Sequence, residues 1–238
     1  MTDWLPTFIA QCSLTPTVED YFMGRGGKES TLESEGVTTG ASVKQEVPNE
    51  TFRFQYGKYG EKLKGMLVCP AWSPSGQMIG FEARSTTKKF IRDFRLPEAK
   101  WQPFWLGLRA GMPKIWAGGD VWVVEGLFDK AALEWAVPEK DAVLASVRAA
   151  LSKAHIDFLQ RFCKGCVHMV YDQDPTGRKA TVGWVDETGR RRMGALDLLR
   201  KAGVECRDVP YSSAKDPGEF WNRGGAVAVQ TAFKGALR

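Results

Sequence analysis

The sequence predicts an α/β protein whose C-terminal half is a mostly parallel sheet flanked by helices. From about residue 119 onward, apolar strand-like runs alternate with helical segments, and such alternation is typical of parallel sheets. Acidic residues stand at the ends of these runs. The N-terminal half instead shows short strands and turn sequences, and Gly118 and Gly119 separate the two halves. We therefore expect a smaller mixed α+β N-terminal subdomain as well.

The elements of the second half follow in a regular order. Strands are expected at residues 121–124, 142–145, 167–171 and 204–209. Helices are expected at 128–136, from the cap at Ser152 to Arg161, and at 194–202. The stretch 184–192 has the sequence of an inserted turn or hairpin.

The first half has a different pattern. A short helix is expected from Pro16, capped by Thr15 and ended by the glycines at 24, 26 and 27. A loop with a weak helical turn should follow over 28–49. Strands at 52–56, 65–69 and 77–83, with a turn at 73–76, predict a small antiparallel sheet. The predicted division is a basic subdomain at 1–118, a metal-binding subdomain at 119–220 and a helical segment at 221–238. The sheet should carry basic side chains at Lys62, Lys64, Arg84, Lys88 and Lys89.

Composition sets broad limits. The 238 residues carry a net charge of +5, which permits a polyanionic partner without establishing one. No run of about 18 apolar residues and no signal peptide is visible, so we expect a cytoplasmic protein without a membrane partner. Cys163 and Cys166 have the spacing of half a zinc site, but no second pair completes it. We expect packing rather than zinc.

Five acids are candidate metal ligands. The carboxyl ends of parallel strands meet at one edge of a sheet, where such folds bind ligands. Carboxylates gathered there repel one another unless cations lie between them, and Mg²⁺ prefers oxygen ligands. Any one of these acids alone is more often a helix cap or a solvated side chain, whereas their joint occurrence favours a site. The acids are Glu125, Asp129, Asp172, Asp174 and Asp216.

The order of these acids resembles a known signature. Glu-Gly-x-x-Asp at 125–129, Asp-x-Asp-x-x-Gly-x-x-Ala at 172–180 and Lys-Asp-Pro-x-Glu at 215–219 are similar to the motifs of the Toprim domain. Elsewhere the chain resembles the RNA-polymerase region of DnaG-type primases over roughly residues 16–220. The segments that carry this resemblance are 21–27, 66–70, 76–84, 88–90 and 144–161.

The resemblance implies a Toprim fold, Rossmann-like in its sheet, and RNA primer synthesis on single-stranded DNA from ribonucleoside triphosphates. Glu125, Asp172 and Asp174 would be the catalytic and metal-binding carboxylates, with Asp129 and Asp216 as supporting acids. Two Mg²⁺ or Mn²⁺ ions would be held there. Arg84 and Lys89 would contact the triphosphate or the primer–template backbone. Further expected nucleotide or nucleic-acid contacts are Arg25, Lys62, Lys64, Lys88, Arg148 and Lys215.

Departures from the family pattern keep alternatives open. Gly218 stands where the family usually has a second Asp, and Arg148 replaces a usual glycine. The zinc ribbon and the helicase-binding domain of DnaG-type primases are absent from this sequence, so a zinc-ribbon module or a replicative helicase in trans is an implied partner. We expect a compact catalytic core, either natural to a phage or mobile element or cut from a larger protein. A Toprim nuclease and a catalytically weak nucleic-acid-binding accessory module are the alternative functions.

Overall fold

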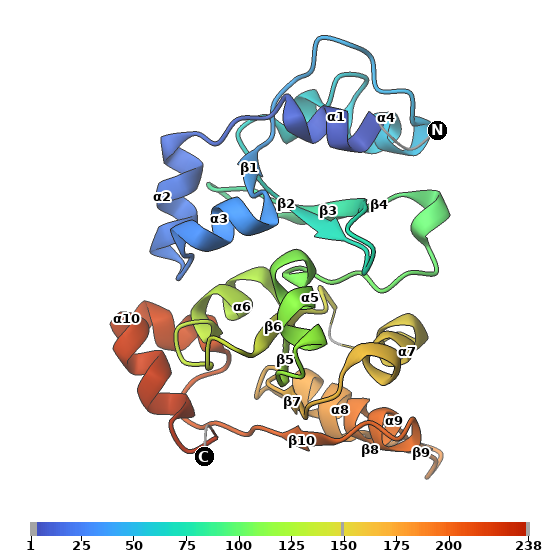
Figure 1. Ribbon diagram of the computed structural model, residues 1–238, viewed down its shortest axis with the longest axis vertical. Coiled ribbons are helices and arrows are strands. Elements are labelled where there is room, and N and C mark those ends of the chain that lie inside the picture. Colours follow the sequence, from blue (N-terminus) through green and yellow to red (C-terminus); the bar gives the residue numbers. More distant parts are fainter. Residues whose placement is uncertain (1–3, 149, 237–238) are drawn as a thin grey trace.

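Two sheets lie one above the other along the long axis of the molecule (Figure 1). The computed structural model describes residues 4–148 and 150–236. An antiparallel sheet occupies the N-terminal half and a parallel sheet the C-terminal half. The predicted α/β class with a mixed N-terminal part is confirmed.

The antiparallel sheet has the order β1-β2-β3-β4. Its tight turn is built by Ser73, whose hydroxyl accepts a hydrogen bond from the amide of Gln77 at 3.0 Å, and by Gly76 at a φ of 79°. The strands predicted around 65–69 and 77–83 are therefore present. The bounds are β1 Thr38–Thr39, β2 Leu67–Trp72, β3 Met78–Arg84 and β4 Ile91–Arg95.

The strand predicted at 52–56 is wrong, because this segment is the helix α4, Glu50–Tyr56. Asn49 begins it, accepting a hydrogen bond from the amide of Phe52 at 2.9 Å. Phe52 and Tyr56 lie four residues apart on one helix face and are both buried. Phe54 between them is 86% exposed, so the aromatic alternation did not reflect alternating burial.

The other elements of the N-terminal half are short helices, most of them around the antiparallel sheet, whereas α5 (Leu108–Trp116) packs on the parallel sheet (Figure 1). The helix predicted at Pro16 is confirmed, and the segment 28–49 contains a complete short helix, ended by Gly36 in the left-handed conformation. The helices are α1 Trp4–Ala10, α2 Pro16–Gly24, α3 Glu29–Glu35 and α5 Leu108–Trp116, with the 3₁₀ turns η1 Glu61–Leu63 and η2 Pro97–Ala99.

The parallel sheet has the order β10-β7-β5-β6, and its predicted strands and the small hairpin are present. The strands are β5 Val121–Val124, β6 Ala142–Ala145, β7 Val167–Met169 and β10 Cys206–Asp208, and the hairpin is β8 Trp184–Val185 with β9 Arg191–Arg192. The helices are α6 Leu127–Leu133, α7 Lys153–Phe162, α8 Pro175–Val182, α9 Ala195–Lys201 and α10 Pro217–Phe233.

Two hydrophobic cores hold these layers together. One lies on the face of the parallel sheet that α5, α7 and α9 cover. The other continues from the antiparallel sheet to the opposite face of the parallel sheet, where it includes Trp122 and Phe128, and reaches Phe220 of α10. Since this core joins the two halves, the carboxyl edge of the parallel sheet is fixed relative to the antiparallel sheet. The division at residues 118 and 220 stays a prediction.

None of the helices within 4–148 and 150–236 combines the length and apolar character needed to cross a bilayer.

Candidate active site

The acid group lies where β5, β7 and the loop before α10 end. Glu125 directly follows β5, and Asp129 stands in the first turn of α6. Asp172 follows β7, while Asp174 begins α8 and accepts hydrogen bonds from the amides of Thr176 and Gly177. Fold topology thus brings together carboxylates from distant parts of the chain.

Asp216 completes this group as the N-cap of α10. Its side chain accepts a hydrogen bond from the amide of Glu219 at 2.7 Å. The amide of Gly218 donates to Oδ1 of Asp129 at 3.3 Å, so the start of α10 is tied to the first turn of α6. All five predicted acids therefore border one site, and their roles as ligands and catalysts stay predictions.

Burial is the main cause of the raised pKa values of Asp129 and Glu125, and the charges of neighbouring acids are the second. Burial, followed by the charges of Asp216 and Asp172, raises the pKa of Asp129 to about 7. Burial also raises the pKa of Glu125, and the charge of Asp172 adds to this. Carboxylates with raised pKa values are poorly compensated by the protein alone, which favours an additional cation.

Lys215 is the cation of the chain that lies against two of these acids. Its ammonium nitrogen lies 2.8 Å from Oδ2 of Asp172 and 3.4 Å from Oδ2 of Asp174. Burial raises the pKa of Asp172 while Lys215 opposes the rise. Helix-capping hydrogen bonds, the one from Gly177 foremost, lower the pKa of Asp174.

The donor set fits a divalent metal, because it consists of carboxylate oxygens and already holds one positive group between two of them. No group of three or more His, Cys, Asp or Glu side chains in the described part of the chain is arranged to hold a metal ion. The acids border one site, and Lys215 pairs with two of them.

A basic pocket of about 460 Å³ opens beside the acids. Arg25, Arg84, Lys88 and Lys89 line it, so four of the predicted nucleotide contacts come together. The guanidinium groups of Arg25 and Arg84 both lie over the ring of Phe128, at 4.5 and 4.9 Å from its centre.

The pocket and the acids meet at Gly126. A Cβ atom on this residue would lie 3.0 Å from Oδ2 of Asp129 and 3.3 Å from Nη2 of Arg84. Glycine thus permits a carboxylate and a guanidinium to approach the same stretch of backbone. A ligand with both a metal-binding and an anionic part could span this point.

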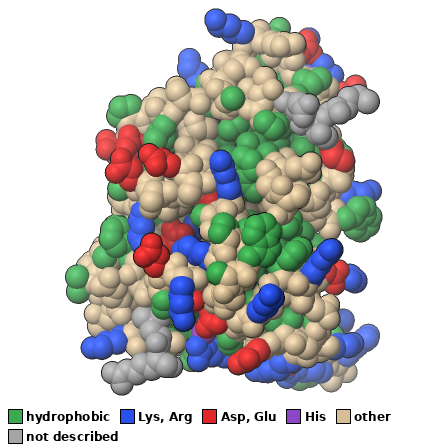
Figure 2. Space-filling model, viewed as in Figure 1, with side chains coloured by type: hydrophobic (Ala, Val, Ile, Leu, Met, Phe, Trp, Pro, Cys, Tyr) green, Lys and Arg blue, Asp and Glu red, His purple; other side chains and the backbone are tan. Residues whose placement is uncertain are grey.

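Four predicted contacts lie outside this pocket: Lys215 pairs with the acids, and the other three lie elsewhere. Arg148 is exposed and pairs with Asp93 of β4 at 3.4 Å. Lys62 and Lys64 are exposed on the turn before β2 and are not among the lining residues. On the face in Figure 2, Lys and Arg side chains are scattered rather than gathered into one patch. Among the described residues, the basic side chains expected to contact nucleotide thus come together only at the pocket lined by Arg25, Arg84, Lys88 and Lys89.

Sequence reasoning missed three aromatic residues of the site. The guanidinium groups of Arg25 and Arg84 stack on the ring of Phe128, and Tyr21 lines the same pocket. The Tyr211 hydroxyl donates toward the carbonyls of Tyr171 and Lys215, at 3.2 and 3.0 Å. Phe128 could have been found, since it lies inside the Glu125–Asp129 motif.

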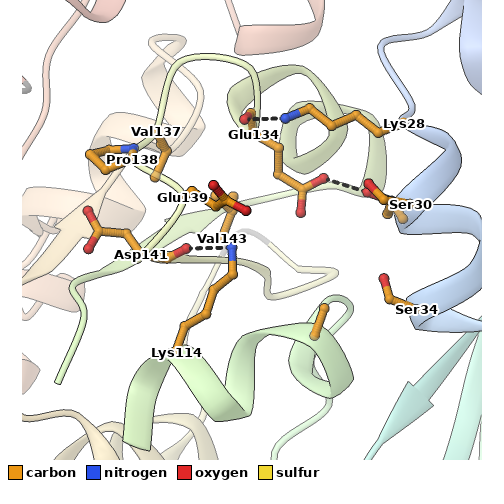
Figure 3. A pocket seen from close by; sticks show the side chains of 12 residues that line it. Lys28, Ser30, Ser34, Lys114, Glu134, Val137, Pro138, Glu139, Asp141 and Val143 are labelled. Carbon is orange, nitrogen blue, oxygen red and sulfur yellow. Dashed lines mark hydrogen bonds between the residues drawn. The ribbon is translucent and has the colours of Figure 1, made fainter. Parts of the chain in front are cut away.

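A second cavity, of about 380 Å³, lies between α3, α5 and the end of α6 (Figure 3). Its two lysines are already bonded: Lys28 donates to the carbonyl of Glu134 at 2.8 Å, and Lys114 donates to the carbonyl of Asp141 at 3.1 Å. The cavity shares no lining residue with the acid group. We interpret it as a junction between the two halves of the chain.

Comparison with known proteins agrees with this geometry. A Toprim-like family profile matches residues 122–221. A DNA primase of Deinococcus radiodurans is 26% identical in an alignment that covers 92% of this chain and 39% of that relative. The chain therefore spans well under half the length of this relative.

Solved structures show the same fold. The Aquifex aeolicus primase, comprising zinc-binding and RNA-polymerase domains, superposes with a TM-score of 0.69 at 22% identity, covering 98% of this chain and 60% of that one. A DnaG primase catalytic domain bound to single-stranded DNA gives 0.68 at 16% identity, covering 98% of this chain and 77% of that one. The chain is thus similar in sequence to a bacterial DNA primase, has the fold of the DnaG catalytic core, and matches a Toprim-like domain over residues 122–221.

Proposed function

We propose that this chain is the catalytic core of a DNA primase, a nucleotidyltransferase that makes short RNA primers on single-stranded DNA. One observation carries the proposal: a basic pocket adjoins a group of carboxylates, and both meet at Gly126. A polymerase must hold a triphosphate and a pair of metal ions side by side. The relationship to DNA primases and the DNA-bound DnaG structure support the same substrate class.

Each set of residues has a part in this reaction. Two divalent ions, when bound, would activate the primer hydroxyl and neutralise the leaving pyrophosphate. Glu125, Asp172 and Asp174 would hold them, with Asp129 and Asp216 in support. The ions are Mg²⁺ or Mn²⁺ in this proposal. A helicase or a zinc-ribbon module as a partner stays a prediction.

Arg25 and Arg84 would bind the triphosphate. Arg25 has a buried Nε atom with no hydrogen-bond partner among the described residues, so it has a donor free for a phosphate oxygen. Lys88 and Lys89 line the same pocket and would add positive charge without fixed geometry. The planar guanidinium groups on Phe128 would set the position of the triphosphate.

A primer-synthesis assay tests the proposal. The wild-type protein should join labelled ribonucleotides into short primers on a mixed-sequence single-stranded DNA template in the presence of Mg²⁺ or Mn²⁺. Glu125→Gln should reduce synthesis by at least about 100-fold, because it keeps the shape of the side chain and removes a carboxylate charge. Asp157→Asn is the matched control, since Asp157 pairs with Lys153 on the exposed surface of α7 and should leave synthesis unchanged.

Other outcomes would contradict the proposal. Metal-dependent shortening of the DNA without synthesis would identify a Toprim nuclease. Unchanged synthesis in Glu125→Gln would remove Glu125 from the reaction. DNA binding without either activity would favour an accessory module.

A further inference from the structure

We propose that Lys215 is a tethered cation of the carboxylate site, which holds Asp172 and Asp174 together until a divalent ion displaces its ammonium group. This inference rests on the proposed metal-binding role of the two aspartates. It assigns Lys215 a function in addition to the nucleotide or nucleic-acid contact expected from the sequence.

The ammonium group of Lys215 lies against both carboxylates. Nζ is 2.8 Å from Oδ2 of Asp172 and 3.4 Å from Oδ2 of Asp174, so one nitrogen pairs with both carboxylates. A hard divalent ion between these residues would use the same oxygen atoms. The ammonium and the metal therefore cannot both occupy this position.

The backbone of Lys215 is fixed independently of its side chain. The amide of Gln173 donates to the carbonyl of Lys215 at 2.8 Å, and the Tyr211 hydroxyl donates to the same carbonyl at 3.0 Å. The amide of Lys215 donates to Glu219 at 2.6 Å. The loop thus stays attached to the Asp172 loop when the ammonium group leaves.

The side chain itself can move out. It is 53% exposed, whereas the side chain of Asp172 is 12% exposed. Rotation about the side-chain bonds can carry the ammonium into water without any change in the core. Its tether keeps it close to the acids, where it can pair with a phosphate of a bound nucleotide. Lys215 would then pair with the two aspartates when no metal is bound, and with a nucleotide phosphate when metal and nucleotide are bound.

Charge balance gives the exchange a direction. The ammonium supplies one positive charge to the carboxylates of Asp172 and Asp174, and a divalent ion would supply two. Without the ammonium group of Lys215, the carboxylates should repel one another more strongly when no metal is bound. An added metal ion would then have no ammonium group to displace.

Mn²⁺ binding measured by electron paramagnetic resonance tests this exchange without reference to catalysis. Lys215→Gln should bind Mn²⁺ about tenfold more tightly than the wild type, the change expected when one charge-assisted hydrogen bond no longer has to be broken. Lys215→Arg, which keeps a cation, should remain within about threefold of the wild type.

Lys179→Gln is the matched control, because it removes the same charge from the exposed face of α8, the helix that Asp174 caps. It should change Mn²⁺ affinity by less than about twofold. In EDTA, Lys215→Gln should also melt at a lower temperature than Lys179→Gln, and Mn²⁺ should remove this difference.

The results separate this inference from the proposed function. If Asp172→Asn weakens Mn²⁺ binding but Lys215→Gln binds it as the wild type does, or more weakly, the exchange is overturned and the metal site stands. If Asp172→Asn leaves Mn²⁺ binding unchanged, the metal site fails and the exchange fails with it. If Lys215→Gln and Lys179→Gln raise the affinity for Mn²⁺ equally, the change follows from the loss of one positive charge near the site. That result would also overturn the exchange.

Discussion

The guanidinium of Arg84 lies over the ring of Phe128, with its central carbon 4.9 Å from the ring centre. Arg84 ends β3 of the antiparallel sheet, and Phe128 lies in the first turn of α6, a helix of the C-terminal half. Arg25 lies over the same ring at 4.5 Å. One aromatic side chain thus positions two cations from different parts of the chain next to the carboxylates.

Arg25→Lys should weaken ATP binding by about five- to tenfold, measured by isothermal titration calorimetry. The substitution keeps the charge but loses the planar contact with Phe128 and the donor at Nε, and such losses cost about 1–1.4 kcal/mol. Since Arg25 lines the pocket, the loss should appear in affinity rather than in stability.

Arg109→Lys provides the comparison. Arg109 is exposed and lies over the ring of Trp72 at 4.5 Å, so it has the same stacked geometry outside the pocket. Its replacement should leave ATP affinity unchanged. Equal losses in the two variants would argue against a specific triphosphate site at Arg25.

The raised pKa of Asp129 predicts a pH-dependent stability in the absence of metal. Its folded value of about 7 lies above the ordinary 3.8, so the folded state binds more protons between these values. The free energy of unfolding should therefore fall as pH rises through this range. The side chain of Asp129 is half-buried, so solvent screens part of this effect and we expect a contribution on the order of 2 kcal/mol.

Asp129→Asn removes this titration and keeps the shape. In EDTA at pH 8 it should be more stable than the wild type by about that amount, and near pH 4 the two should converge. Urea unfolding across the pH range measures the difference. A constant difference at all pH values would show that Asp129 ionises normally.

Lys130 connects the two halves of the chain through buried charge. Its side chain is 1% exposed, and its ammonium lies 2.6 Å from Glu134. Burial lowers its pKa, but the charges of Glu134 and Glu35 outweigh this and raise it. Glu35 is buried as well and accepts a hydrogen bond from the amide of Ala110 at 2.9 Å.

Lys130→Ala should destabilise the protein by about 3–5 kcal/mol, because it leaves buried carboxylates without their cation. Lys153→Ala tests the role of burial, since Lys153 also pairs with a residue four positions later at 2.6 Å but is 85% exposed. That variant should lose only about 0.3–0.5 kcal/mol. If urea unfolding showed similar losses in the free energy of unfolding for the two variants, burial would not explain the effect of Lys130.

The sequence predicted the parallel sheet well because its strands are short apolar runs between clear turn and helix signals. Residues 121–124 and 142–145 were predicted with their observed bounds. The antiparallel half was harder. The segment 91–95 was missed because its first three residues are exposed at the sheet edge and carry no apolar pattern.

The sequence predicted which acids lie in the candidate site, but not which side chains pair with them or stack beside them. Motif order placed Glu125, Asp172 and Asp216 at one edge, since strand ends fix backbone positions. The pairing of Lys215 depends instead on how two loops dock and which rotamer a flexible side chain adopts. Sequence spacing carries no information on either, and the same applies to the arginines on Phe128.

Gly218 offers a test of charge density in the site. A Cβ atom there would lie 3.2 Å from Oδ1 of Asp129 and 3.3 Å from Oδ1 of Asp216. Gly218→Asp should therefore lower the stability in EDTA by about 1–2 kcal/mol more than Gly218→Asn, which has the same shape without the charge. This difference corresponds to roughly 2–8 °C in melting temperature.

Added Mn²⁺ should reverse the order of the two variants, because the extra carboxylate contributes a ligand to a bound cation and binding to the folded state raises its stability. The measurement is a thermal melt of both variants with EDTA and with millimolar Mn²⁺. If Gly218→Asp stays below Gly218→Asn in Mn²⁺, the new carboxylate does not reach the cation. Position 218 would then lie outside the metal site, and the five acids already present would have to form it without help from the first turn of α10.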